Sequence, residues 1–216
     1  MQIAALQDTN AQAASARSRL YLLLACVFAF PDEEIHESIR DGSLAGSIEQ
    51  LCSQLPYRFA AADLSALASA DQPYADFESE YIRLFDVGAA GPPCPLYGGV
   101  YIGDRMKVME DAVRFYNFFG LRLSPEMREL PDHVTTELEF LHYLTFREAG
   151  ARENGEDPSS LLRAERDFLA RHLCRWIPRM QERLAKQDTC VFYKGLVEFA
   201  AAFFESDRRY AAACTA

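Results

Sequence analysis

The sequence predicts an all-α protein, a single helical bundle of roughly ten helices with one Gly/Pro-rich hinge loop. Apolar residues recur at helical spacing, as in the stripe of Tyr74, Phe77, Tyr81, Leu84 and Phe85. Sustained alternation of apolar and polar residues is absent and β-branched residues are few, so no strand is predicted. Half of the 216 residues are hydrophobic, which is enough for a sizeable core.

The chain is expected to form one all-helical domain over residues 11–207. Residues 1–10 are mostly polar and are predicted to form a flexible N-terminus, and residues 208–216 are predicted to form a flexible tail. Four glycines and three prolines lie in the segment 86–100. This composition predicts a long irregular loop, which is either functional or a domain hinge.

The first half of the chain contains five predicted helices. Ala/Leu-rich sequence without Gly or Pro predicts the first, which Pro31 ends. A short acidic helix follows, then two segments of small and polar residues, and then the aromatic stripe that begins after Pro73. The predicted ranges are 11–30, 32–40, 44–55, 60–70 and 73–85.

The first helix has features of a targeting segment. Arg17 and Arg19 precede an apolar run from Leu20 to Phe30, as in a secretory signal. The run has no small-residue cleavage site and is too short to span a bilayer. It is therefore interpreted as a buried helix, without stable membrane insertion.

The second half of the chain contains four predicted helices. Gly120 fits a C-terminal cap of the first, and Pro178 is expected to interrupt the third. The predicted ranges are 104–119, 132–153, 159–186 and 188–207.

The helix that starts at Pro131 and Asp132 is predicted to organise the rest of the chain. Asp132 is a good N-cap, and apolar positions with helical spacing follow it. His133 and Glu137 lie four residues apart near its N-terminal end, so the helix carries a titratable pair. Such a pair suits either a structural role in the core or a binding site.

Charge and cysteine content exclude several classes of protein. The net charge of −10 argues against nucleic-acid binding and suits a partner with positive charge. The six cysteines form no Cys-x-x-Cys pair, and without a secretory signal they are expected to be free thiols in the cytoplasm. No P-loop, dinucleotide, serine-hydrolase or zinc-protease motif is present, so neither an enzyme nor a resident cofactor or metal is predicted.

One enzyme hypothesis stays open. Glu139 and His142 have the Glu-x-x-His spacing of di-iron helical bundles, and Glu33 and His36 repeat it. A helical di-iron oxidoreductase built on Glu139 and His142 is therefore the alternative function.

A basic stripe is a second open motif. Four arginines recur every four residues on one predicted helix, and they either form a solvated face or bind a phosphate-bearing ligand. They are Arg171, Arg175, Arg179 and Arg183.

Three stretches of the chain, within residues 80–101, 115–140 and 168–193, carry the signatures of one family. The most distinctive element is Pro-Asp-His-x-x-x-Glu-Leu-Glu-Phe, which ends at Phe140. In their order and motifs these stretches resemble the TorD/DmsD/NarJ family of cytoplasmic redox-enzyme maturation chaperones. Members often have an acidic residue or Ser shortly after the Pro-rich loop, whereas Gly98 and Gly99 occupy that place here.

The resemblance implies a non-enzymatic chaperone that binds the twin-arginine signal peptide and the catalytic subunit of a dimethyl sulfoxide reductase-family molybdoenzyme. It implies help with cofactor insertion and a block on premature export, with weak binding of a guanine nucleotide or the molybdopterin cofactor as an accessory activity. The signature positions carried over as signal-peptide-binding residues are Tyr81, Phe85, Pro93, Pro95, Tyr97, Asp132, His133 and Glu137.

The chemistry of these residues suits such a leader. A twin-arginine leader offers two guanidinium groups followed by an apolar run, so its receptor needs carboxylates and an apolar groove. Asp132 and Glu137 are expected to supply the charge. Tyr81, Phe85 and the Pro-rich loop are expected to supply the groove, and the net charge would steer a basic leader toward it.

Overall fold

The computed structural model describes residues 2–58, 64–89, 91–124 and 129–215. Within these ranges the chain forms α-helices, one 3-10 turn (η1) and one π-helical turn (η2), with no strand, so the predicted all-α class is confirmed. The elements are α1 (Gln2–Phe28), α2 (Glu33–Arg40), α3 (Ser43–Cys52), η1 (Leu64–Ala68), α4 (Tyr74–Tyr81), η2 (Ile82–Asp86), α5 (Gly98–Ile102), α6 (Arg105–Phe118), α7 (Val134–Glu153), α8 (Ser159–Arg171), α9 (Leu173–Leu184) and α10 (Val191–Cys214).

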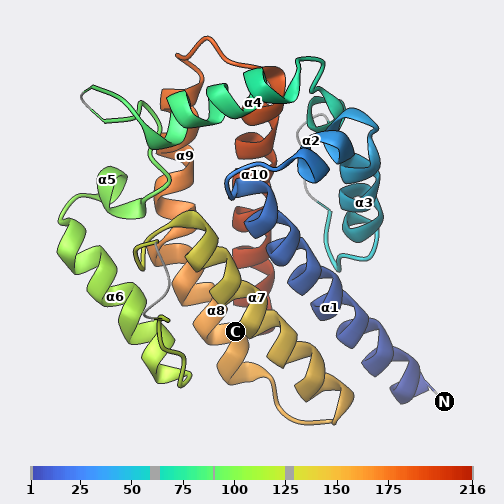
Figure 1. Ribbon diagram of the computed structural model, residues 1–216. Helices are drawn as coiled ribbons and strands as arrows, with labels where there is room; N and C mark the ends of the chain where they lie inside the picture. The colour runs from blue at the N-terminus through green and yellow to red at the C-terminus, as the bar shows by residue number, and fades with distance from the viewer. Residues whose placement is uncertain (1, 59–63, 90, 125–128, 216) are drawn as a thin grey trace.

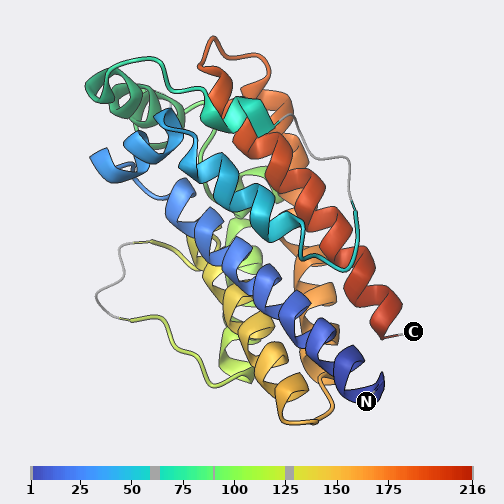
Figure 2. The same cartoon turned by 90° about the vertical axis from the view of Figure 1, so that its right-hand side faces the viewer.

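The long helices form a bundle around one core. α1 and α7 lie side by side, and α10 packs against α8 and α9 (Figures 1 and 2). α2, α3 and α4 cover the upper end of the bundle in Figure 1, and α5 and α6 flank α8 and α9 on its left. The start of α7 and the loop before α5 lie near the ends of α1 and η2.

The apolar run of the first helix is mostly buried, as the sequence predicts, although Leu22, Cys26 and Phe30 are exposed. Leu20, Tyr21, Leu24 and Phe28 face the core, where Tyr21 packs on Phe203. Burial of each such side chain contributes about 1.5–3 kcal/mol. Among the residues that the structure describes, no single helix combines the length and hydropathy of a membrane span; only the sharply bent pair of α1 and α2 meets the criterion jointly.

Several element boundaries differ from the expected ones. α1 begins at Gln2, before the predicted start at residue 11. The predicted flexible tail is instead helical through Cys214, because Asp207 and Ala211 face the core and continue the buried stripe of α10. Residues 60–63 of the helix predicted at 60–70 lie outside the described ranges, and residues 64–68 form the 3-10 turn η1.

The long helix predicted over 159–186 breaks at His172 rather than at Pro178. Pro178 lies inside α9, whereas His172 has φ −118° and ψ −103° and separates α8 from α9. The imidazole of His172 contacts a buried carboxylate of α7, which fixes the residue in this non-helical conformation. The change of direction thus follows from a tertiary contact that local sequence rules do not include.

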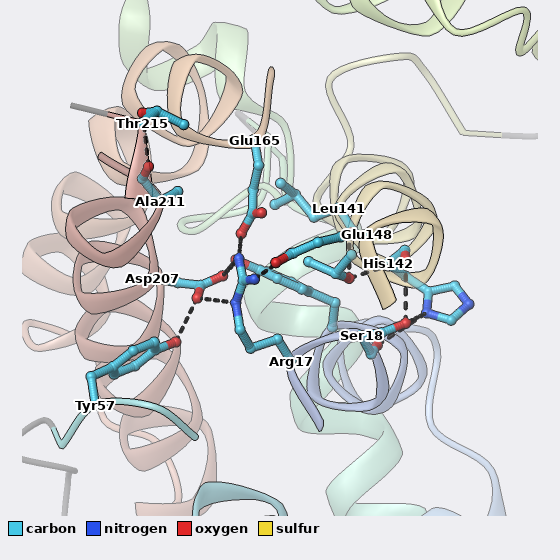
Figure 3. Close-up of polar contacts among 12 residues, drawn as sticks. Arg17, Ser18, Tyr57, Leu141, His142, Glu148, Glu165, Asp207, Ala211 and Thr215 are labelled. Atoms are coloured by element: carbon cyan, nitrogen blue, oxygen red, sulfur yellow. Dashed lines mark hydrogen bonds and ion pairs between the residues drawn. The ribbon is translucent and has the colours of Figure 1, made fainter. Parts of the chain in front are cut away.

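A buried charge cluster joins α1, α7, α8 and α10 (Figure 3). Arg17 is completely buried; its Nε lies 2.5 Å from Asp207 Oδ1, its Nη1 lies 2.6 Å from Glu148 Oε2, and its Nη2 contacts Glu165. Tyr21 and Tyr57 each donate a hydrogen bond of 2.6 Å to Asp207.

Burial favours the neutral form of a guanidinium, but the carboxylates of this cluster outweigh it. The net effect of burial, Asp207 and Glu148 is a pKa of Arg17 well above its ordinary value. Arg17 therefore remains charged and ties together four helices that are distant in sequence.

Candidate functional site

A pocket of about 350 Å³ lies where α1, η2, the Gly/Pro loop and the start of α7 meet. We call it the aromatic pocket. Its lining residues come from the first two of the three signature stretches, 80–101 and 115–140, and from the end of α1. They are Ala29, Phe30, Tyr81, Phe85, Asp86, Leu96, Tyr97, Glu129, His133 and Thr135.

The π-helical turn η2 sets the floor of the pocket. The Val87 amide donates to the Ile82 carbonyl at 2.9 Å, which closes a turn one residue wider than an α-helical turn. Phe85 faces inward and Asp86 is exposed. The predicted helix over 73–85 thus changes type after Tyr81, and the change puts an apolar ring and a carboxylate at the same pocket.

The Gly/Pro loop is fixed by backbone hydrogen bonds at both ends. The Cys94 amide donates to the Leu84 carbonyl at 2.9 Å, and the Val134 amide donates to the Leu96 carbonyl at 2.9 Å. Tyr97 and His133 form an isolated antiparallel bridge. The loop therefore holds Leu96 and Tyr97 against the start of α7.

His133 is the N-cap of α7, a role that the sequence assigned to Asp132. Its Nδ1 accepts a hydrogen bond from the Thr135 amide at 3.3 Å and lies 2.7 Å from Thr135 Oγ1. With Nδ1 as the acceptor, the imidazole carries its proton on Nε2, which lies 3.7 Å from Glu129 Oε2. His133 and Glu137 thus have separate partners and do not pair with each other.

Two carboxylates line the pocket. Glu129 has a side chain that is 43% exposed and accepts a 2.6 Å hydrogen bond from the Tyr97 hydroxyl. The negative field reaches Tyr81, whose pKa is raised by burial and further by Glu129 and Asp86. An incoming cation would therefore meet a negative potential in a partly desolvated space.

One lining residue of the pocket is both apolar and exposed. Phe30 is 52% exposed and contacts the Tyr81 ring edge-on, with 5.5 Å between ring centroids. Val87 and Leu130, which directly follow the two carboxylates in sequence, are also exposed but do not line the pocket. A large apolar side chain left in water beside an acidic pocket favours a ligand with both a cationic and an apolar part.

Asp132 and Glu137, which were expected to bind arginine, are both completely buried. Asp132 Oδ2 accepts a 2.8 Å hydrogen bond from the Gly99 amide. Glu137 accepts a 2.9 Å hydrogen bond from Trp176 Nε1 and lies 3.1 Å from His172 Nδ1. Neither carboxylate lines the pocket, so their role in this structure is to join α7 to the loop and to α9.

The two glycines after Tyr97 are required by these contacts. A Cβ on Gly99 would lie 2.9 Å from Asp132 Oδ2 and 2.8 Å from the Cγ of Arg105. A Cβ on Gly98 would lie 3.0 Å from the Trp176 ring. The departure from the family pattern at this point therefore lets the loop pack directly on the buried side chains of Asp132 and Trp176.

Four of the eight predicted signal-peptide-binding residues line the aromatic pocket, and four do not. Tyr81, Phe85, Tyr97 and His133 meet there. Pro93 and Pro95 are half-buried in the adjoining loop and do not line the pocket, and neither do the completely buried Asp132 and Glu137.

Sequence reasoning missed the carboxylates that do line the pocket. Asp86 directly follows the aromatic stripe, and Glu129 precedes the Leu-Pro-Asp-His element. Both border a signature without belonging to its most distinctive part. Asp86 and Glu129 could have been identified as acidic residues directly beside the motif residues of the first two signature stretches.

The di-iron alternative finds no support in the geometry. Glu139 is exposed, and His142 Nδ1 lies 2.9 Å from Ser18 Oγ. His36 is on a different helix and contacts the Gln72 carbonyl. Across the described ranges, no three His, Cys, Asp or Glu side chains are placed to hold a metal ion.

The predicted arginine stripe is divided by the break at His172. Arg171 ends α8, where its Nη1 lies 3.4 Å from Asp111 Oδ1. Arg179 donates to the Tyr101 carbonyl, and Arg183 lies over the Tyr101 ring at 4.5 Å. Arg175 lines a separate cleft with Arg171. The four arginines therefore do not form one continuous binding face.

The chain resembles known proteins over most of its length. Residues 41–182 match the family described as nitrate reductase delta subunit. The chain is 32% identical to the perchlorate reductase assembly chaperone protein of Dechloromonas aromatica (strain RCB), over 88% of each chain. It is 34% identical to the selenate reductase assembly chaperone protein of Thauera selenatis, over 78% of this chain and 77% of the relative. The chlorate reductase assembly chaperone protein of Ideonella dechloratans is 40% identical, over 52% of this chain and 59% of its own.

These relatives are named as assembly chaperones and not as catalysts, which supports a non-enzymatic protein. The matched family region contains every lining residue of the aromatic pocket except Ala29 and Phe30. The chain belongs to the nitrate reductase delta subunit family of redox-enzyme assembly chaperones, in agreement with its resemblance to TorD, DmsD and NarJ proteins.

Proposed function

We propose that this chaperone binds the twin-arginine leader of its client in the aromatic pocket. The observation that carries the proposal is the composition of that pocket: two accessible carboxylates, Asp86 and Glu129, lie among four signature residues and beside the exposed ring of Phe30. This combination matches a peptide that has guanidinium groups next to an apolar run.

A guanidinium in this pocket would be recognised by charge and by aromatic rings. Glu129 is already oriented by the Tyr97 hydroxyl, so it can accept from an arginine with little loss of side-chain freedom. The rings of Tyr81, Phe85 and Tyr97 border the same space and favour a cation over their faces. The apolar residues of the leader would then cover Phe30, which lines the pocket and is exposed.

The proposed client is the catalytic subunit of a molybdopterin-dependent oxidoreductase of the dimethyl sulfoxide reductase family. The names of the relatives, assembly chaperones of perchlorate, selenate and chlorate reductases, support a redox-enzyme client. Leader binding in the cytoplasm would hold the precursor back from export while its cofactor is inserted. Asp132 and Glu137 serve this function as positioning residues, because they hold the loop and α9 against α7.

The test uses a synthetic twin-arginine leader peptide and the full chain. Asp86→Asn with Glu129→Gln should weaken peptide binding by at least about 100-fold, since hydrogen bonds to charged groups contribute about 1.5–3 kcal/mol each. Isothermal titration calorimetry gives the dissociation constant. The control is Glu153→Gln with Glu156→Gln, which removes the same charge from two exposed positions at the far end of α7.

A leader in which both arginines are replaced by lysine separates bidentate recognition from charge alone. The proposed site requires that this leader bind more weakly and that its remaining affinity depend less on Glu129. Equal affinities in the pocket variant and the control variant would place the leader elsewhere.

A further inference from the structure

A second pocket, of about 210 Å³, is formed by α6, the segment that follows it and one face of α7. We call it the α6–α7 pocket. It shares no lining residue with the aromatic pocket. Its lining residues are Tyr116, Leu121, Arg122, Leu123, Thr136, Glu139, Phe140 and Tyr143.

The size and walls of the α6–α7 pocket suit a single aromatic ring. Sites for drug-sized ligands and cofactors have volumes of about 300–1,000 Å³, whereas an apolar cavity of about 150 Å³ binds benzene. The rings of Tyr116 and Phe140 pack edge to face in the wall, with 4.9 Å between ring centroids. Leu121 and Leu123 add aliphatic surface. The pocket therefore has room for one ring with a small substituent, and not for a whole cofactor.

Thr136 gives this pocket a buried polar group without a partner. The residue is 6% exposed, and its Oγ1 has no hydrogen-bond partner among the described residues. A threonine inside a helix usually donates to the carbonyl three or four residues earlier. Here the carbonyls of His133 and Asp132 accept instead from the amides of Glu137 and Gly98. A buried hydroxyl left in this way costs free energy until a ligand or water completes it.

The other polar groups of the pocket differ in how far they are already used. The Tyr116 hydroxyl donates to the Pro131 carbonyl at 2.8 Å, and the Tyr143 hydroxyl accepts from Arg147 Nη1 at 2.8 Å. Glu139 is exposed and makes no hydrogen bond or ion pair with the described residues. Its carboxylate lies three residues after the orphan hydroxyl, a spacing that makes the two side chains neighbours on one helix face.

The carboxylate and the hydroxyl together select a phenol. A carboxylate only accepts, so the ligand must donate to Glu139, whereas the Thr136 hydroxyl can donate to the ligand. A phenol oxygen does both with one atom. An indole N–H donates but cannot accept, and an unsubstituted ring does neither. Arg122, which also lines the pocket, adds a guanidinium, which favours the face of an aromatic ring.

We propose that the α6–α7 pocket binds the side chain of a tyrosine presented by a polypeptide partner. The phenol oxygen accepts from Thr136 Oγ1 and donates to the Glu139 carboxylate. A polypeptide is favoured over a free phenol because the relatives of this chain are named as assembly chaperones. Binding here does not depend on leader binding, since the two pockets have no lining residue in common.

The experiment is an NMR titration of the ¹⁵N-labelled full chain with three probes of similar shape. They are p-cresol, p-methylanisole, which accepts a hydrogen bond but cannot donate one, and toluene, which does neither. p-Cresol should bind at least 10-fold more tightly than the other two, because a hydrogen bond to a charged group contributes more than about 1.4 kcal/mol. The largest amide shifts should fall in α7 around Thr136 and Glu139.

Two isosteric variants separate the polar contacts from simple packing. Thr136→Val should weaken p-cresol binding at least 5-fold and leave toluene binding equal or tighter. It removes a hydroxyl that has no partner, so the thermal unfolding temperature should not fall. Glu139→Gln should also weaken p-cresol binding, since a neutral amide accepts a weaker hydrogen bond than a carboxylate.

Matched controls lie on the same helix. Thr145→Val removes a buried hydroxyl that makes the usual 2.8 Å bond to the Leu141 carbonyl, and Glu153→Gln removes an exposed carboxylate at the far end of α7. Both should leave p-cresol affinity unchanged. A blocked pentapeptide with tyrosine between glycines should compete with p-cresol, and its phenylalanine counterpart should bind at least 10-fold more weakly.

Four results would overturn the proposal. They are equal affinity for p-cresol and toluene, equal loss of both in Thr136→Val, amide shifts confined to other elements, and p-cresol binding without competition by the tyrosine peptide. The last result would assign the pocket to a free small phenol. Affinity for the leader peptide should stay unchanged in Thr136→Val, so a failure here is distinguishable from a failure of the aromatic pocket.

Discussion

The Arg17 cluster and the aromatic pocket are built from the same kinds of residue, but only in the Arg17 cluster does a buried guanidinium pair with the carboxylates. In the Arg17 cluster, three carboxylates and two tyrosine hydroxyls surround a buried arginine. In the aromatic pocket, Glu129, Asp86 and the tyrosines Tyr81 and Tyr97 line an accessible space. In the first region the carboxylates are neutralised within the chain, whereas in the second they face an accessible space.

The difference shows how burial decides the role of a carboxylate. Asp207 is fully buried and its charge is matched by Arg17, so it contributes to the fold. Glu129 is partly exposed and has a tyrosine hydroxyl for a partner, so its charge remains available at the surface. Negative charge in a sequence therefore indicates recognition only where the fold leaves it accessible.

The largest effect is expected from Arg17→Met. Removing the guanidinium leaves Asp207, Glu148 and Glu165 buried without it, which should lower the free energy of unfolding by about 3–5 kcal/mol. Urea denaturation followed by circular dichroism measures the change. Arg19→Met, two residues along α1 on its exposed face, is the matched control. Similar stability of the two variants would contradict the assigned role of the cluster.

A smaller loss of stability is expected from a substitution at Gly99, where the loop packs on the buried Asp132 side chain. Gly99→Ala places a methyl group 2.9 Å from Asp132 Oδ2, and overpacking of this kind costs about 1–3 kcal/mol. Gly150→Ala has open space around its Cβ inside α7 and should stabilise the protein by up to about 1 kcal/mol. Thermal unfolding of the two variants should give shifts of opposite sign.

An arginine introduced into the aromatic pocket should make the pocket resemble the Arg17 cluster, with its carboxylates paired within the chain. Ala29→Arg extends a guanidinium from the end of α1 into the space beside Glu129 and Asp86. It should compete with the leader and weaken peptide binding at least 10-fold, which is about 1.4 kcal/mol. Ala29→Met fills similar volume without charge. If both variants bind the leader equally well, the pocket does not receive an arginine.

The smallest effect concerns the cap of α7. Burial lowers the pKa of His133, and Glu129 and Asp132 only partly offset this. Folding thus favours the neutral imidazole. The contribution of His133 to the free energy of unfolding is complete above the ordinary His pKa of about 6.5, and it is lost as pH falls through the lower pKa of the folded state. Between about pH 7 and pH 5, unfolding free energy should fall more in wild type than in His133→Asn, whose amide caps without titrating, by under about 1 kcal/mol. Urea denaturation at several pH values tests this, and parallel curves would contradict it.

The fold could be predicted because helical periodicity is a local property of the sequence. The buried run of α1 and the inward stripe from Phe77 to Phe85 follow directly from spacing. The Arg17 cluster was missed although it leaves a trace: Arg17, Glu148, Glu165 and Asp207 each replace an apolar residue within a buried stripe. One positive and three negative charges at such positions predict that their helices meet.

The lining of the candidate pocket could be predicted only in part, because motifs name residues but not their exposure. Tyr81, Phe85, Tyr97 and His133 meet at one pocket, as their shared signatures suggested. Asp132 and Glu137 share the most distinctive signature, yet both bind the protein's own backbone and side chains. Which carboxylate faces water depends on where the loop folds back onto α7, and no local pattern encodes that contact.

The π-helical turn η2 is a place where a change in chain length, instead of a substitution, would reshape the aromatic pocket. Deleting one residue from Ile82–Asp86 would restore an ordinary helical turn and rotate the preceding residues by about 100° relative to the following ones. Phe85 and Asp86 would then point in new directions relative to Tyr81. If the pocket binds the leader as proposed, a single-residue deletion here would change which leaders this chain recognises.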